Sequence, residues 1–135
     1  MNSVLNSVTI TPLYAALLGL VLLVLSGRVI AVVRAKGEIN LGDGGNPDFQ
    51  VAIRQHGNFI EYVPLILILI GFAEAGGASN AWIHGLGGAL LVGRIAHPLG
   101  LKPTPGPNVL RFVGTVLTLV ALLVSAILVL MQQLG

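Results

Sequence analysis

Four polar side chains open an otherwise apolar stretch of the chain: Arg54, Asn58, Glu61 and Tyr62. Helical residues are about 100° apart around the axis, so the first three fall within about 60° and Tyr62 borders the stripe. A guanidinium binds carboxylates and a carboxylate binds ammonium groups, which suits a zwitterionic ligand. The alternative is a structural ion pair between Arg54 and Glu61, bridged by Asn58, that fixes helix packing. The stretch continues into LILILIGF, and ionisable residues within membrane segments mark functional sites by default, so we favour the ligand site.

The composition is that of an integral membrane protein. The 135 residues are 55% hydrophobic and 9% charged, with a mean hydropathy of +0.92, whereas soluble domains carry about 25% charged residues. The absence of cysteine excludes disulfides, thiolate metal ligands and a cysteine nucleophile. A net charge of +2 from dispersed basic residues gives no indication of a nucleic-acid partner. The first residues lack the basic region and cleavage site of a signal peptide, so we expect the first apolar segment to be a retained helix.

Four apolar segments organise the chain, at residues of about 10–33, 53–73, 81–98 and 109–131. A helix crosses the hydrocarbon core with roughly 20 residues, which the first and last segments supply easily. The third is short and rich in glycine, but a strand or loop could not satisfy its backbone in lipid, so we expect a helix there too. The sequence therefore predicts an all-α membrane protein with one domain over residues 1–135, folded as a four-helix transmembrane bundle.

Small residues and a proline predict two local features of these helices. Gly85, Ala89 and Gly93 recur at every fourth position of the third segment, which makes a ridge suited to close helix packing. The alternative is that glycine is simply common in membrane helices. Pro64 removes one backbone hydrogen bond from the second helix, which either bends the helix and widens a crevice beside the polar stripe or is merely tolerated.

Helix-start signals precede three of the segments. Pro47 and Asp48 come before the second segment, where we expect a helix start, and the acid can cap the helix or complement its dipole. Ser79 and Asn80 come before the third segment, and Asn108 comes before the fourth. Serine and asparagine are preferred residues at the first position of a helix, so we expect the third and fourth helices to begin there.

The basic residues predict how the chain sits in the membrane. They flank the first and third connections and are missing from the second: Arg28, Arg34, Lys36, Arg54, Arg94, Lys102 and Arg111. The positive-inside rule then places the first and third connections in the cytoplasm and both termini outside. Six polar residues fall at one depth, in the cytoplasmic third of the membrane: Arg54, Asn58, Glu61, Arg94, His97 and Arg111.

Arg94 and Arg111 each have two interpretations. An arginine near a helix end commonly anchors the helix by extending its head to the membrane interface. The functional alternative is electrostatic stabilisation of an anion such as a thiolate, because a neighbouring cation favours the charged form of sulfur. Spacing alone leaves both interpretations open for both arginines.

The three histidines and one outer acid complete the set of ionisable groups considered. His56 points about 160° away from Arg54 around the second helix. His84 lies near the outer interface and His97 near the inner one, so the histidines do not form a metal site. Glu74 lies at the outer end of the second segment, and we expect its carboxylate to be solvated.

The run PDFQVAIRQHGNFIEYVP resembles the signature of the membrane-associated proteins in eicosanoid and glutathione metabolism, the MAPEG family. The pattern R-x-x-x-N-x-x-E-Y-x-P is fairly specific, and the resemblance covers essentially the whole chain. The sequence is most similar to bacterial members of the family. The resemblance implies four membrane helices, a homotrimer, and glutathione bound between subunits on the cytosolic side.

Matched by position, the polar stripe corresponds to the residues of the second helix that contact glutathione in the family: Arg54, Asn58, Glu61 and Tyr62. The resemblance also implies a contribution from His56, whose position is often polar or histidine in the family. Glutathione carries two carboxylates and one ammonium group, so a site for it needs both an arginine and an acid.

Three further residues are assigned to the same site, Arg111 and His97 through the resemblance and Arg94 by its charge and depth. Arg111 resembles the arginine that activates the glutathione thiol in one branch of the family, and it is our candidate catalytic residue. Arg94 and His97 are candidate glutathione-binding residues on the third helix. A glutathione-contacting tyrosine of that helix is replaced here by His97, a departure that favours a non-catalytic member as the alternative.

The resemblance implies a glutathione-dependent transferase or peroxidase that acts on a lipophilic small molecule reaching the site through the bilayer. One alternative is a non-catalytic scaffold that binds lipid or glutathione. A less favoured alternative is a small proton-coupled exporter that uses Glu61, although that acid lies toward one face of the membrane and the first helix has none. We expect a multi-pass protein of the bacterial inner membrane with both termini in the periplasm.

Overall fold

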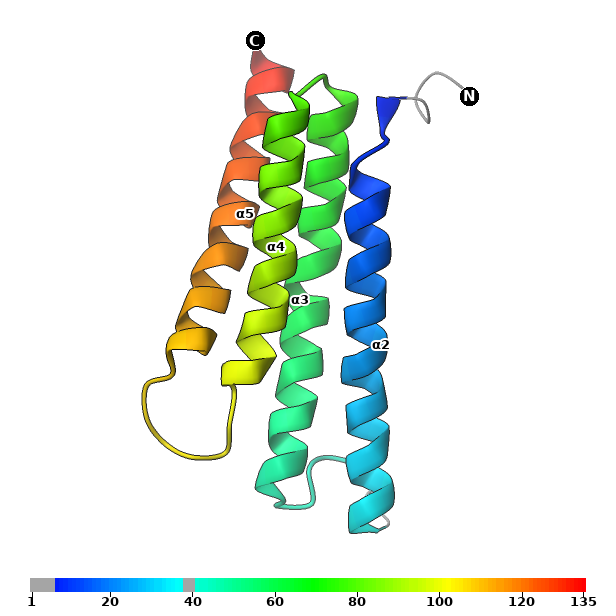
Figure 1. Cartoon of the computed structure of the whole chain (residues 1–135), viewed down its shortest axis with the longest axis vertical. Helices are drawn as coiled ribbons and strands as arrows, with labels where there is room; N and C mark the ends of the chain where they lie inside the picture. The colour runs from blue at the N-terminus through cyan, green and yellow to red at the C-terminus, as the bar shows by residue number, and fades with distance from the viewer. Residues whose placement is uncertain (1–6, 38–40) are drawn as a thin grey trace.

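The chain folds into a bundle of long, roughly parallel and antiparallel helices (Figure 1). The computed structural model describes residues 7–37 and 41–135, and within these ranges it contains no strand. Its four long helices are α2 (Thr11–Lys36), α3 (Pro47–Ala75), α4 (Asn80–Gly100) and α5 (Val109–Leu134). The predicted all-α four-helix fold is thereby confirmed.

Helix α3 begins at Pro47, where the sequence signals predict a helix start, and so it precedes the apolar segment that opens near residue 53. The side-chain oxygen of Asn46 accepts hydrogen bonds from the backbone N–H groups of Asp48, at 3.0 Å, and Phe49, at 3.2 Å. The cap is therefore Asn46 and not Asp48, and proline fits the first helical position because its missing N–H is not needed there. The extra turns make the polar stripe part of a continuous helix, which also runs through Pro64 without a break.

The other helix starts follow the sequence closely. The side-chain oxygen of Asn108 accepts a hydrogen bond of 3.3 Å from the backbone N–H of Arg111, which caps α5 as predicted. Ser79 occupies the capping position of α4, although its side chain makes no capping hydrogen bond. These short connections fix where α4 and α5 turn back into the bundle.

Helices α2, α3 and α5 are each long and apolar enough to cross a membrane. Helix α4 has 21 residues, so it is about 31 Å long at 1.5 Å per residue. It includes a buried arginine, Arg94, and it packs against all three other helices. The lengths and composition of these helices show an integral membrane protein.

Helices α3 and α4 form the middle of the bundle because each contacts all three other helices, whereas α2 and α5 do not touch each other. The start of α2, the α3–α4 connection and the end of α5 lie together at one end of the bundle, here called the turn end (Figure 1). The α2–α3 and α4–α5 connections lie at the opposite end, here called the loop end. The sequence predicts that the loop end faces the cytoplasm.

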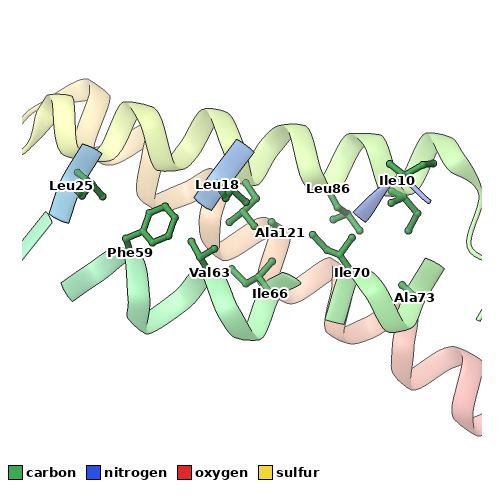
Figure 2. Packing of buried hydrophobic residues seen from close by; sticks show 12 residues of the cluster. Ile10, Leu18, Leu25, Phe59, Val63, Ile66, Ile70, Ala73, Leu86 and Ala121 are labelled. Atoms are coloured by element: carbon green, nitrogen blue, oxygen red, sulfur yellow. The ribbon is translucent and has the colours of Figure 1, made fainter. Parts of the chain in front are cut away.

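The hydrophobic core runs along α3 (Figure 2). Its buried side chains on α3 are spaced three and four residues apart, so they form one face of the helix: Phe59, Val63, Ile66, Ile70 and Ala73. Leu18 and Leu25 of α2 and Ala121 of α5 pack against this face. Many other large apolar side chains are exposed on the outside of the bundle, where lipid would surround them.

The closest helix contact differs from the predicted glycine ridge. Gly85 has open space where a side chain would stand, so it faces away from the other helices. A Cβ at Gly93 would meet the carbonyl oxygen of Gly114 at 3.0 Å, and a Cβ at Gly114 would meet the backbone nitrogen of His97 at 2.6 Å. Of the two ridge glycines, Gly93 therefore lies at the α4–α5 crossing and Gly85 does not, and the glycine that faces Gly93 comes from α5.

Candidate functional site

The polar stripe makes two separate contacts, one between Arg54 and Glu61 and one between Asn58 and Arg94 of α4. Arg54 and Glu61 form an ion pair across the surface of α3, with Nη1 and Oε1 3.3 Å apart and side chains 56% and 51% exposed. The pair is direct and is not bridged by Asn58. The pair passes over Gly57, where a Cβ would lie 3.6 Å from Arg54 Nη1, an ordinary contact distance. The pair lies open on the outside of the bundle rather than sealed within it.

Asn58 turns instead toward α4, where it contacts Arg94. The Nη1 atom of Arg94 donates a 2.8 Å hydrogen bond to the side-chain oxygen of Asn58 and a long one of 3.5 Å to its carbonyl. The arginine is only 2% exposed. Its Nε is buried without a partner, and no acid pairs with the guanidinium among the described residues. A buried cation with an unused donor is costly, so this group needs an explanation.

A small hollow of about 30 Å³ adjoins the buried guanidinium. It lies where α3, α4 and α5 meet, and its lining residues are Asn58, Tyr62, Arg94, Thr115, Thr118 and Leu119. A volume of roughly 10–15 Å³ is enough for a water molecule, so the hollow accepts one small polar group without rearrangement. The hydroxyls of Thr115 and Thr118 donate to carbonyls of their own helix, at 2.9 Å and 2.8 Å, and present their oxygen lone pairs to other donors.

Arg111 lies one turn before Thr115 at the start of α5. Its side chain is exposed and lines a groove of about 450 Å³ whose other residues are Gly106, Pro107, Asn108, Val109, Phe112 and Thr115. Thr115 also lines the hollow beside Arg94, so the groove and the hollow adjoin. A second recess of about 90 Å³ on the other side of Arg111 includes Lys102 and Thr104. The start of α5 thus combines an apolar groove with two cations.

The histidines occupy different places from one another. His97 is 6% exposed on α4, and its Nδ1 is buried without a hydrogen-bond partner. Its backbone packs against Gly114 of α5, so it lies near Arg94 but does not line the hollow. His56 is half-buried and is not among the residues lining the hollow or the Arg111 groove. In the described part of the chain no three potential metal ligands gather.

Sequence reasoning missed three residues of this region. Gln55 is 2% exposed, and its amide donates to the carbonyls of Pro98, at 2.6 Å, and Leu101, at 3.1 Å. It therefore ties the start of α3 to the end of α4. Thr115 and Thr118 were also missed, although two polar residues spaced one turn apart in a strongly apolar helix were a signal that could have found them.

The prediction that Glu74 is solvated was wrong. Its side chain is 6% exposed. The carboxylate accepts hydrogen bonds from the backbone N–H groups of Thr9, Ile10 and Thr11, at 2.7–2.8 Å, and from the Thr11 hydroxyl at 2.6 Å. The first turn of a helix has N–H groups without partners and a positive dipole end, and Ile10 supplies no side-chain cap to α2. The end of α3 therefore supplies the cap for α2.

The loop-end site is rich in positive charge. Arg94 is buried, Arg54 and Arg111 are exposed, and Glu61 is paired with one of them. Such a set can bind more than one carboxylate and one ammonium group, because each arginine offers several donors and the acid accepts. Asn58, Tyr62 and Arg94 line one hollow. The paired residues Arg54 and Glu61, and also Arg111, are exposed.

Comparisons with known proteins agree with this architecture. The model of the MAPEG family matches residues 11–131. The inner membrane protein YecN of Escherichia coli K12 is 40% identical over 91 residues, which cover 67% of this chain and 69% of that protein. The YecN of an Escherichia coli O6:H1 strain matches to the same extent. No solved structure gives a significant match. The family predicted from the polar stripe is thus confirmed, and this integral membrane protein belongs to the MAPEG family.

Proposed function

We propose that this protein is a glutathione-dependent membrane transferase or peroxidase for lipophilic electrophiles. In this proposal it works as a homotrimer, with glutathione held at the loop end between neighbouring subunits. The proposal combines the membership in the MAPEG family with the charges found at the loop end. Glutathione supplies the sulfur nucleophile, and the chain supplies charge, position and an apolar approach for the second substrate.

The buried guanidinium of Arg94 is the observation that carries the proposal. Its desolvation is costly, and one neutral side chain, Asn58, is its partner in the described structure. An anionic ligand group that reaches the hollow would pair with the guanidinium and neutralise its charge. A carboxylate suits this position because a guanidinium binds it with two parallel hydrogen bonds.

The exposed pair of Arg54 and Glu61 fits the opposite end of glutathione. An amino-acid group carries an ammonium and a carboxylate side by side, so it can replace the internal ion pair with two ion pairs of its own. The existing pair is half-exposed and joined through a single contact of 3.3 Å, so opening it costs little. The two residues would then hold the charged end of the ligand while Arg94 binds its other carboxylate.

In this proposal Arg111 acts on the sulfur of glutathione. A free thiol has a pKa of about 8.5, and an adjacent cation lowers it by favouring the thiolate. The guanidinium of Arg111 has no other partner in the described ranges, and it borders the apolar groove beside Phe112. A lipophilic molecule in this groove would meet the sulfur next to the cation, which would also stabilise negative charge developing during reaction.

The trimer explains why half of the site lies on the surface. Arg54 and Glu61 face outward from the bundle at a level where α3 runs into the membrane. Exposed charges are expensive in lipid, and a neighbouring subunit would remove them from it. A ligand bound there would lie between two copies of the chain.

Glutathione affinity of the purified protein in mild detergent tests the proposal. Replacing Arg54 or Glu61 by alanine removes one charge-assisted contact of about 1.5–3 kcal/mol, so we expect each variant to bind about 10- to 150-fold more weakly by calorimetry. Arg34→Ala, which removes an exposed arginine of α2 away from the stripe, is the matched control and should bind normally. Wild-type affinity in both stripe variants would refute the site.

A second candidate is a non-catalytic scaffold that binds glutathione or lipid. The buried position of His97 favours it, because this side chain does not line the hollow and so does not replace the family's tyrosine there. Turnover with a generic aromatic electrophile distinguishes the two candidates. A glutathione-dependent rate that falls sharply in Arg111→Ala supports the enzyme, whereas the spontaneous rate together with intact glutathione binding supports the scaffold.

A further inference from the structure

Apart from the proposed glutathione site, the bundle has an apolar groove between α2 and α4, toward the loop end. It holds about 220 Å³, and its walls are Val21, Val24, Leu25 and Arg28 of α2 and Ile95, Pro98 and Leu99 of α4. It shares no residue with the hollow or the groove at Arg111. The groove is therefore separate from the proposed glutathione site.

The shape of the bundle accounts for this groove. Near the turn end, Tyr14 of α2 packs directly over Gly87 of α4 and its hydroxyl lies 3.0 Å from His84 Nδ1. Toward the loop end, α4 is held against α5 by the contact of Gly93 with Gly114. Helices α2 and α4 therefore diverge along their length, as Figure 1 shows. The divergence leaves apolar walls that the chain itself does not fill.

Arg28 is the only charged side chain in the groove. It is exposed, and in residues 7–37 and 41–135 it has neither an ion pair nor a hydrogen-bond partner. If α2 enters the hydrocarbon at Thr11, Arg28 lies about 26 Å along the helix axis, just inside the far boundary of a core about 30 Å thick. The flexible stem of an arginine spans this remaining distance, so its guanidinium can reach the headgroup level.

We propose that this groove is a binding site for an anionic phospholipid. The acyl chain lies along the apolar walls formed by Val21, Val24 and Ile95, and Arg28 pairs with a headgroup whose phosphate has no compensating ammonium beside it. The charge match argues for this occupant, because an apolar slot in a membrane protein that ends at one free cation complements a chain that ends at an anion. Glutathione fits poorly, because the walls offer no polar partners for its peptide groups.

Native mass spectrometry of the full chain in mild detergent tests the site. The protein is mixed with equal amounts of dioleoyl phosphatidylglycerol and dioleoyl phosphatidylcholine, and the retained lipids are compared. One arginine near an anionic headgroup corresponds to about a fivefold preference, which we expect for the wild type and for Arg34→Gln. Arg28→Gln replaces an exposed side chain, so it should fold normally and lose the preference.

Two outcomes would overturn the proposal. If Arg28→Gln and Arg34→Gln change the lipid preference equally, or if neither changes it, the groove does not select lipids by headgroup charge. Ile95→Trp fills the groove, and we expect it to reduce retention of both lipids with an unchanged helical signal. If this variant retains lipid normally but changes the oligomeric mass, the groove is occupied by a second copy of the chain instead.

Discussion

Two buried charges beside α3 are treated in opposite ways, one at the turn end of this helix and one near its middle. At the turn end, the carboxylate of Glu74 accepts hydrogen bonds from three backbone groups and one hydroxyl. Near the middle, Arg94 is bound through one nitrogen to Asn58 while its Nε has no partner. The acid has complete coordination, whereas the arginine lacks a charged partner and lines a hollow, which is why the proposed function uses it. We therefore assign the acid to folding and the arginine to function.

Removal of Glu74 should produce the largest loss of stability. Glu74→Ala leaves the first turn of α2 without its acceptor, and we expect a loss of about 3 kcal/mol because several charge-assisted hydrogen bonds disappear together. Thermal unfolding in detergent, followed by circular dichroism, measures this change. Glutathione affinity of the folded protein should stay at the wild-type value. A variant that unfolds at the wild-type temperature would show that the cap is not needed.

The α4–α5 crossing should be almost as sensitive. In Gly114→Ala the new methyl group meets backbone atoms of His97 and Gly93, which cannot move aside as a flexible side chain would. We expect a loss of about 1–3 kcal/mol, together with weaker glutathione binding because Thr115 shifts relative to Arg94. Gly85→Ala is the matched control, since its side chain enters open space and gains helix propensity of up to about 1 kcal/mol. Equal stability of the two variants would contradict this crossing.

Replacement of Arg94 by methionine tests most clearly whether Arg94 differs from Glu74 in its contribution to stability. The change removes an expensive buried cation and fills its volume with an apolar chain, so we expect a stability within about 1 kcal/mol of wild type, or slightly higher. The same unfolding experiment serves for this variant. A loss as large as that of Glu74→Ala would mean that Arg94, too, is a structural residue.

The smallest effect on stability should come from the exposed ion pair. Arg54→Ala and Glu61→Ala each break one half-exposed contact, which contributes about 0–1 kcal/mol. Chemical unfolding in a denaturing detergent series gives the comparison, with Arg34→Ala as the exposed control. A large destabilisation would assign this pair to folding, on the side of Glu74, and would weaken its proposed role with the ligand.

The fold could be predicted from the sequence because each membrane helix contains a continuous apolar run, which is a local feature. The segments near residues 109–131 and 81–98 required only small extensions, to Leu134 and Gly100. Pro47 and Asp48 marked the start of α3, but hydropathy did not, because the capping side chain of Asn46 precedes a polar stretch that does not look like a membrane helix. Hydropathy locates the buried part of a helix better than its polar first turns.

The site could be predicted only in part. The spacing of the stripe along one helix identified its four residues. Their angular order around α3 already separates Arg54 and Glu61 from Asn58 and Tyr62. The sequence pattern did not show that Asn58 contacts Arg94, because these residues are 36 positions apart. The partners of Glu74 are 63–65 positions away, which is why its burial could not be foreseen.

The most direct test is a calorimetric titration of glutathione into the wild type and Arg94→Met, in the same detergent and with Arg94→Lys as the charge-conserving control. We expect measurable binding to the wild type, about tenfold or greater weakening in Arg94→Met, and an intermediate affinity in Arg94→Lys, since lysine keeps the charge but loses the two-pronged geometry. Equal affinity in all three proteins, with Arg94→Met as stable as the wild type, would contradict the assignment of this buried cation to the ligand.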